Sequence, residues 1–277
     1  MASLRSISLL AACCALSLHA AEDPKELVRR AIAQHGHNDA VERQYTFLQR
    51  EDIRAIDGSG KVRHQDLRTY DITLCEGTPY TRLIQRDDKP LPAKEEKQQQ
   101  DNLQKSIDQR RKETPEQRQQ RIADWNRKRQ NQQNELMEIP DAFDFKLAGE
   151  DFINGIPVWV VDGTPRPGYK SKSKMTAYFL KVKGRMWIAK SDYQPVKMEA
   201  VTLDTISIGA FLIRFAKGGH INVEFSRVNN EVWLPKHVGM TGSARLLLVK
   251  GFQLDADFAF SNYKKFSAES RVVETGQ

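Results

Sequence analysis

Two pairs of side chains have the residue types that chemistry requires. The stretch His35–His37 holds two histidines that could bind a metal, but a structural zinc site needs about four ligands at defined spacing, and no others lie nearby in the sequence. Asp192 and Glu199 could serve as paired carboxylates. A helix-end histidine pair, a turn residue and an outward-facing strand residue explain these positions more simply.

Short catalytic motifs do not support enzyme chemistry either. The chain has no G-x-S-x-G, no P-loop, no G-x-G-x-x-G and no C-x-x-C motif. We therefore expect a protein that is not an enzyme and that uses no cofactor and no metal. An enzyme with an unrecognised constellation would need polar residues converging in one hollow, and the sequence shows few.

Residues 1–21 have the layout of a secretory signal peptide. Arg5 precedes an apolar run from about Ile7 to Leu18, and the small pair Ala20–Ala21 leads into charged sequence. The run is shorter than the roughly 20 apolar residues that span a bilayer. We expect cleavage near Ala20 or Ala21 and a periplasmic chain. The alternative is a lipoprotein box at Leu10–Cys13, which would leave its cysteine lipidated.

The mature chain must be held together by its core. Loss of Arg5 with the signal lowers the formal net charge from +7 to +6 and leaves Cys75, which cannot form an internal disulfide. We expect Cys75 to be a small half-buried residue at a strand end rather than a reactive thiol. Residues 22–277 can supply one domain with a substantial core.

The overall charge leaves only some partners open. A pI near 9.2 is compatible with nucleic-acid or anionic-surface binding. Because the chain is exported, we expect no nucleic-acid partner. Contact with anionic lipid headgroups or with an acidic partner remains open.

The elements that position these residues are mainly strands. Asp23, Pro24 and Glu26 predict a capped helix that Gly36 ends. Alternation of apolar and polar residues predicts antiparallel strands with one buried face, joined by short turns. The predicted strand regions are Gln44–Asp57, Lys61–Leu74, the stretch after Thr78, 143–151, 157–163, Met186–Ala189, Val196–Leu203, His220–Val228, 231–240, 244–251 and 253–263.

A charged insert, residues 93–138, interrupts the strands. Lys94 to Glu138 contains eleven Lys/Arg and nine Asp/Glu, a near balance that favours a solvated helix face over a polybasic patch. Thr114–Gln117 has the residues of a capping box with proline in the first turn. We expect two helices joined near Thr114, or one kinked helix, with a narrow docking stripe of Ile122, Trp125 and Leu136.

One short apolar helix is expected in the second half. Ile208, Phe211, Leu212 and Phe215 follow helical spacing, and Gly218 and Gly219 stop the pattern. Such a helix would lie in the hollow of the sheet as a lid. The expected fold class is mainly β, with some α: a curved, unclosed antiparallel half-barrel with helices over its concave face.

The segment GRMWIAKSDYQPVKMEA, residues 184–200, resembles the LolA-like family of outer-membrane lipoprotein-sorting proteins. In that family a strand ending in W-[IV]-[DA] leads to a polar turn with Asp and then to P-V-x-[VM]-E. Trp187–Ala189, Asp192 and Pro195–Glu199 match this pattern, except that Ala189 stands where the family usually has an acid. TPRPGY (164–169), DTISIGAFLIRF (204–215) and NNEVWLPKHVGMTGSARL (229–246) look similar, so the resemblance covers roughly Ile139 to Phe266.

The resemblance implies a half-barrel whose hollow holds acyl chains in the members that act as carriers; the charged insert is not part of that pattern. Our hypothesis is a periplasmic, non-enzymatic protein that binds a lipid or lipoprotein acyl chain, in lipoprotein sorting or envelope maintenance. The candidate ligand-binding residues are Phe145, Trp159, Phe211, Leu212, Phe215, Ile221, Phe225, Phe258 and Phe260.

Two other interpretations remain. The same residues could form a closed core, and the protein could be an interaction scaffold or stress-sensor module without a lipid cargo, whose charged insert binds an envelope protein. An empty apolar hollow favours the carrier, and a filled one favours the scaffold.

Overall fold

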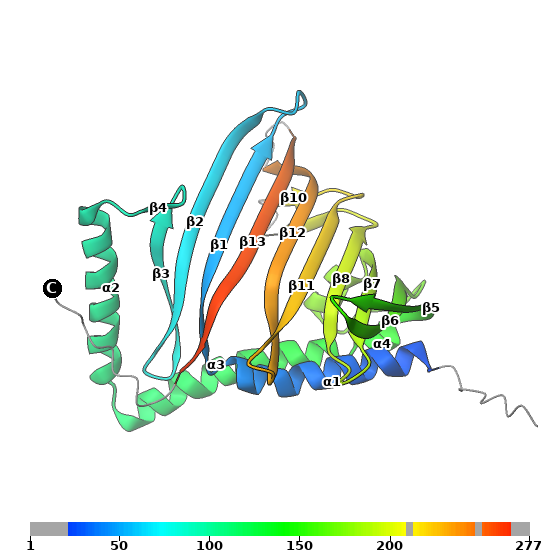
Figure 1. Cartoon of the computed structure of the whole chain (residues 1–277), viewed down its shortest axis with the longest axis horizontal. Coiled ribbons are helices and arrows are strands. Elements are labelled where there is room, and N and C mark those ends of the chain that lie inside the picture. Colours follow the sequence, from blue (N-terminus) through cyan, green and yellow to red (C-terminus); the bar gives the residue numbers. More distant parts are fainter. Residues whose placement is uncertain (1–21, 209–212, 247–250, 267–277) are drawn as a thin grey trace, which may run out of the picture.

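One open antiparallel sheet dominates the molecule. The computed structural model describes residues 22–208, 213–246 and 251–266. Strand order is β4-β3-β2-β1-β13-β12-β11-β8-β7-β6-β5, with β10 beside β12 and β9 beside β10. In the described chain β4 and β5 lie at opposite ends of this order, so the sheet is not closed into a barrel (Figure 1).

The strands confirm most of the expected boundaries. They are β1 (Tyr45–Ile56), β2 (Val62–Cys75), β3 (Thr78–Arg86), β4 (Lys89–Pro90), β5 (Phe143–Ile153), β6 (Ile156–Pro165), β7 (Val182–Ala189), β8 (Pro195–Thr202), β9 (Ile206–Ile208), β10 (Ile213–Phe215), β11 (His220–Val228), β12 (Val232–Leu246) and β13 (Phe252–Lys265). Left-handed residues form the tight turns, including Asn229 and Asn230 between β11 and β12. Among the described strands the first pairs with the last, β1 with β13, so two segments far apart in the sequence lie side by side in one sheet.

Helix α1 (Pro24–Glu42) starts as predicted but ends later. The Asp23 side chain accepts a hydrogen bond from the Lys25 amide, the expected N-cap. The prediction that Gly36 ends the helix is wrong. A side chain at Gly36 would come within 3.0 Å of Gln133 of the neighbouring helix, so glycine here permits close helix packing.

The charged insert forms two helices, α2 (Ala93–Arg111) and α3 (Pro115–Leu136), followed by the short α4 (Ile139–Ala142). Both bonds of the Thr114–Gln117 capping box are present at the start of α3. Helix α2 stands beside β3, whereas α3 runs alongside α1 (Figure 1). No described helix is long and apolar enough to span a membrane.

The apolar helix expected at Ile208–Phe215 is wrong. Residues Ile206–Ile208 and Ile213–Phe215 are strands β9 and β10, and they pair antiparallel with each other. β10 also pairs with β12, where Phe215 lies opposite Ala244. The β-branched isoleucines at both ends of the segment favour extended backbone, and pairing with β12 satisfies its backbone groups. Phe211 and Leu212, the expected lid residues, lie outside the described residues.

Candidate ligand-binding groove

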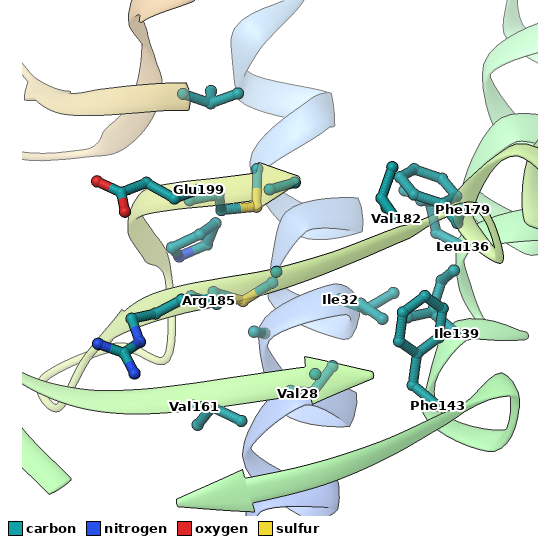
Figure 2. Close-up of a pocket in the computed structure, with 18 of the residues that line it drawn as sticks. Val28, Ile32, Leu136, Ile139, Phe143, Val161, Phe179, Val182, Arg185 and Glu199 are labelled. Atoms are coloured by element: carbon teal, nitrogen blue, oxygen red, sulfur yellow. The ribbon is translucent and has the colours of Figure 1, made fainter. Parts of the chain in front are cut away.

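An apolar cavity of about 450 Å³ lies between α1 and one face of the sheet (Figure 2). Strands β5, β6, β7, β8 and β11 contribute apolar residues mostly at every second position, as expected for one face of a sheet. Sheet residues that line it are Phe143, Phe145, Val161, Gly163, Val182, Gly184, Arg185, Met186, Pro195, Met198, Glu199, Ala200, Ile206, Ile221, Val223 and Phe225. The cavity is partly open to solvent, and we call it the groove.

A row of small residues forms the floor of the groove. Gly163 lies opposite Gly184 on the next strand, and Gly184 lies opposite Ala200. The row is bounded by Phe145, opposite Gly163, and by Ile221, opposite Ala200. The Phe145 ring lies over Gly163, 3.0 Å from where a Cβ atom would stand. The trough of low side-chain volume is therefore at Gly184 and Ala200, between Phe145 and Ile221.

A second row, next to the first, has an adaptable surface. Val161, Met186, Met198 and Val223 lie opposite one another on successive strands. Methionine side chains are unbranched and polarisable and fill irregular spaces. This wall of the groove can therefore adjust to ligands of different shape.

Helices form the other side of the groove. Val28, Ala31 and Ile32 of α1 line it together with Leu136, the last residue of α3, and Ile139 of α4. Figure 2 shows Val28, Ile32, Leu136 and Ile139 grouped beside the sheet strands. The end of the charged insert is therefore part of the groove.

Helix α5 (Lys174–Phe179) stands at the mouth of the groove. Tyr178 and Phe179 line the groove, yet they are 46% and 37% exposed. Ser173 caps α5 by accepting a hydrogen bond from the Thr176 amide at 3.0 Å. The Met175 amide donates to Glu135 of α3, which fixes α5 to the end of that helix.

Polar side chains turn away from the groove. Figure 2 shows the Arg185 and Glu199 side chains extending away from its apolar residues. Arg185 forms a two-point ion pair with Asp162 (2.6 and 2.9 Å), which holds the pKa of that carboxyl below its usual range. The opposite sheet face carries a polar row in register across five strands: Lys146, Asp162, Arg185, Glu199 and Asn222.

An ionic cluster joins α3 to α1 behind the groove. Asp39 accepts hydrogen bonds from Arg43 of its own helix and from Arg129 of α3. Burial raises the pKa of Asp39, but the bonds from Arg129 and Arg43 outweigh it and leave this pKa below its usual value. Both guanidinium groups lie over the Trp125 ring, at 5.5 Å (Arg43) and 5.4 Å (Arg129) from its centroid.

Buried hydrogen bonds set the position of α1 against the sheet. The Asn38 side chain accepts from the Trp233 amide at 2.9 Å and donates to the Trp233 carbonyl. The Gln133 amide of α3 donates to the Ile32 carbonyl at 2.7 Å. These contacts hold the helical wall of the groove against the sheet and against α3.

The structure brings three of the candidate ligand residues together. Phe145, Ile221 and Phe225 all line the groove. Trp159 is instead buried in the core, where it packs against α1 residues. Its ring stacks on the Tyr193 ring with 5.3 Å between the centroids.

The remaining described candidates lie elsewhere. Phe215 is 1% exposed and packs over Gly219 and Gly242. Phe258 and Phe260 lie on β13 and are not among the described residues that line the groove. The Phe260 ring packs against the Phe47 ring of β1, with 6.0 Å between the ring centroids. An aromatic residue on an inward-facing strand position therefore did not identify the groove by itself.

The groove also contains residues that the sequence did not single out. Gly163, Gly184 and Ala200 carry no signal individually, because their role comes from their register. The i, i+2 spacing of Met186 with Gly184 and of Met198 with Ala200 is visible in the sequence, but the pairing that aligns these strands is not.

Two of the side chains first considered for chemistry make structural contacts. Asp192 accepts a hydrogen bond from the Trp233 indole at 2.9 Å, and Glu199 pairs with Lys197 at 2.6 Å. His35 lines the groove. Cys75 is a buried free cysteine at the end of β2. Within the described ranges, no group of three or more His, Cys, Asp or Glu could hold a metal ion.

Comparisons with known proteins found similarity at the level of solved structures. No family model and no curated protein matches the chain. A DUF1329 family protein from Desulfovibrio piger aligns at TM-score 0.36 with 10% identity, over 90% of this chain and 96% of its own. A putative outer-membrane lipoprotein-sorting protein domain from Vibrio parahaemolyticus aligns at TM-score 0.37 with 13% identity, over 88% and 95%.

A LolA superfamily protein from Nitrosomonas europaea aligns at TM-score 0.31 with 11% identity, over 89% of this chain and 95% of its own.

Proposed function

We propose that this protein is a non-enzymatic binder of lipid or lipoprotein acyl chains in the periplasm, active in lipoprotein sorting or envelope maintenance. The observation that carries the proposal is the groove: an open apolar cavity of about 450 Å³. Ligand cavities have volumes of roughly 300–1,000 Å³ and mainly apolar linings. The signal-peptide layout of residues 1–21 and the resemblance of residues 184–200 support the location and the kind of cargo.

The groove suits a flexible hydrocarbon chain better than a polar substrate. Its lining is overwhelmingly apolar, and the Arg185 and Glu199 side chains point out of it. Each buried methylene contributes about 0.8 kcal/mol, so ten would supply about 8 kcal/mol before the costs of ordering the chain. The mouth at Tyr178 and Phe179 leaves room for a headgroup or peptide in water.

A chain-length series tests the proposal. Saturated fatty acids or acylated peptides of increasing length are titrated by calorimetry or thermal shift. The dissociation constant should fall about fourfold for each added methylene, then level off when the groove is full. The melting temperature should rise with ligand concentration by mass action.

A matched pair of variants assigns the binding to the groove. Met198→Asp places a charge in the apolar lining, where desolvation is costly, and should abolish binding. Val201 lies on the same strand but on the opposite face of the sheet, so Val201→Asp should leave ligand binding unchanged. Absence of saturable binding for every chain length in the wild type would refute the carrier and favour an interaction scaffold.

A further inference from the structure

One surface segment of the protein carries basic residues and no acidic ones. Residues 166–183 contain no Asp or Glu and six basic residues: Arg166, Lys170, Lys172, Lys174, Lys181 and Lys183. Arg166 pairs with Asp144 at 3.1 Å, and Lys181 approaches Asp204 at 3.9 Å. The other four are exposed and have no carboxylate within 4.0 Å in the described chain. We call residues 166–183 the basic segment.

The basic segment continues directly into the mouth of the groove. It contains α5, whose Tyr178 and Phe179 are exposed at the mouth and also line the groove. Glu138 accepts the Lys172 amide at 2.8 Å, and Glu135 accepts the Met175 amide, so two acidic residues bind backbone groups of the segment. These bonds hold the segment in a defined place beside the groove.

Lysines next to exposed aromatic side chains are the composition of a membrane-interface contact. Aromatic rings settle at the headgroup level, and cationic side chains are attracted to anionic lipids. An acidic protein would also attract the lysines. It would not explain why Tyr178 and Phe179 are exposed at the opening of a cavity for hydrocarbon chains.

We infer that the basic segment docks the mouth of the groove on an anionic phospholipid bilayer. Docking places the opening at the headgroup region, so an acyl chain passes between bilayer and groove without crossing water. The inference rests on the proposed function, because it assigns the side from which the groove is filled.

Vesicle sedimentation tests the inference on the full mature chain. The wild type should bind vesicles that contain phosphatidylglycerol, bind vesicles of phosphatidylcholine alone far more weakly, and be released by high salt. Each lysine near the surface contributes about fivefold to the partition coefficient. The triple variant Lys170→Gln, Lys172→Gln, Lys174→Gln should therefore bind anionic vesicles on the order of 100-fold more weakly.

A second triple variant controls for total charge. Lys94, Lys97 and Lys105 are exposed on α2, which stands at the opposite end of the molecule from β5 and α4 (Figure 1). Their replacement by Gln removes the same three charges and should change vesicle binding by no more than about twofold, because these charges lie beyond a Debye length of about 10 Å from the docked face. Equal losses in both triple variants would overturn the inference.

Two further measurements separate this inference from its alternatives. Tyr178→Ser should weaken binding to anionic vesicles several-fold. If this variant binds vesicles as well as the wild type does, and if polyglutamate binds as tightly as the vesicles, the partner is an acidic protein and not a bilayer. A water-soluble acyl ligand should bind the wild type and the Lys170–Lys174 variant equally well. Ligand binding without vesicle binding refutes the inference alone, whereas vesicle binding without ligand binding refutes the proposed function.

Discussion

Filling the floor of the groove should separate ligand binding from stability. Ala200 lies at one end of the small-residue row, between Gly184 on one strand and Ile221 on the other, and it lines the groove. Ala200→Phe adds six carbon atoms to a space that is open in the wild-type structure. The ring should enter the trough and lie where the ligand would lie.

The two free energies should change in opposite directions. If the ring displaces about six methylene groups of the ligand, binding weakens by about 4–5 kcal/mol, a factor of about 1,000 or more. Stability should stay constant or rise, because burying the ring contributes about 1.5–3 kcal/mol and repacking costs at most about as much. A closed core would behave differently: overpacking would destabilise it by about 1–3 kcal/mol.

The assay combines urea unfolding with titration of the best-binding acyl ligand. Val201→Phe is the matched control, because it adds a similar ring at the next position of β8, on the opposite face of the sheet. This control should keep the wild-type dissociation constant. Ala200→Phe should show a raised or unchanged unfolding midpoint and no measurable binding.

One result would refute the reasoning. If Ala200→Phe destabilises the protein by more than about 1 kcal/mol and leaves the dissociation constant unchanged, the trough is packed in solution and the ligand binds elsewhere. The floor formed by Gly163, Gly184 and Ala200 would then be a packing feature of the core.

Three further predictions concern the helical wall. Asn38→Ala should destabilise the fold by about 2–5 kcal/mol in urea unfolding, because the buried amide and carbonyl of Trp233 each lose their partner. Asp39→Asn should lower the free energy of unfolding by about 1–3 kcal/mol at pH 7. Because the pKa of Asp39 is lowered in the folded protein, the wild type should lose this stability advantage when unfolding is measured at pH values below the usual carboxyl range. Burial raises the pKa of Glu42 above 4.5 despite the nearby Arg129, so ionisation of this carboxyl lowers the stability of the fold as pH rises through the raised pKa. The variant Glu42→Gln should therefore unfold at a higher temperature than the wild type at pH 7. Below a pH of about 4 the two proteins should unfold at the same temperature.

Local sequence was sufficient where a pattern and its chemistry both lie within a few residues. Asp23 and Thr114 cap helices whose first-turn amides are two or three residues away. Alternation in Ile221–Phe225 predicted a strand with one apolar face, because side chains on extended backbone point to alternate sides. Phe145, Ile221 and Phe225 were placed in the groove for that reason.

Local sequence misled where a distant segment decides the conformation. Ile208–Phe215 has helical spacing of apolar residues, but pairing with β12 makes its described ends strands. Gly36 has the appearance of a helix stop, but the approach of Gln133 from a helix about 100 residues away explains a glycine inside α1. In both cases the partner lies far away in sequence, where no short-range pattern can show it.

By itself, the sequence determined the strands, the capped helices and the mainly β class, because these follow from backbone preferences and the periodicity of apolar residues. Only the tertiary structure decided that a groove exists. Gly163, Gly184 and Ala200 belong to three different strands, and a one-residue shift in any pairing would turn that strand's side chains to the other face. The hollow is thus a property of strand register, which is set by backbone pairing between segments that lie far apart in the sequence.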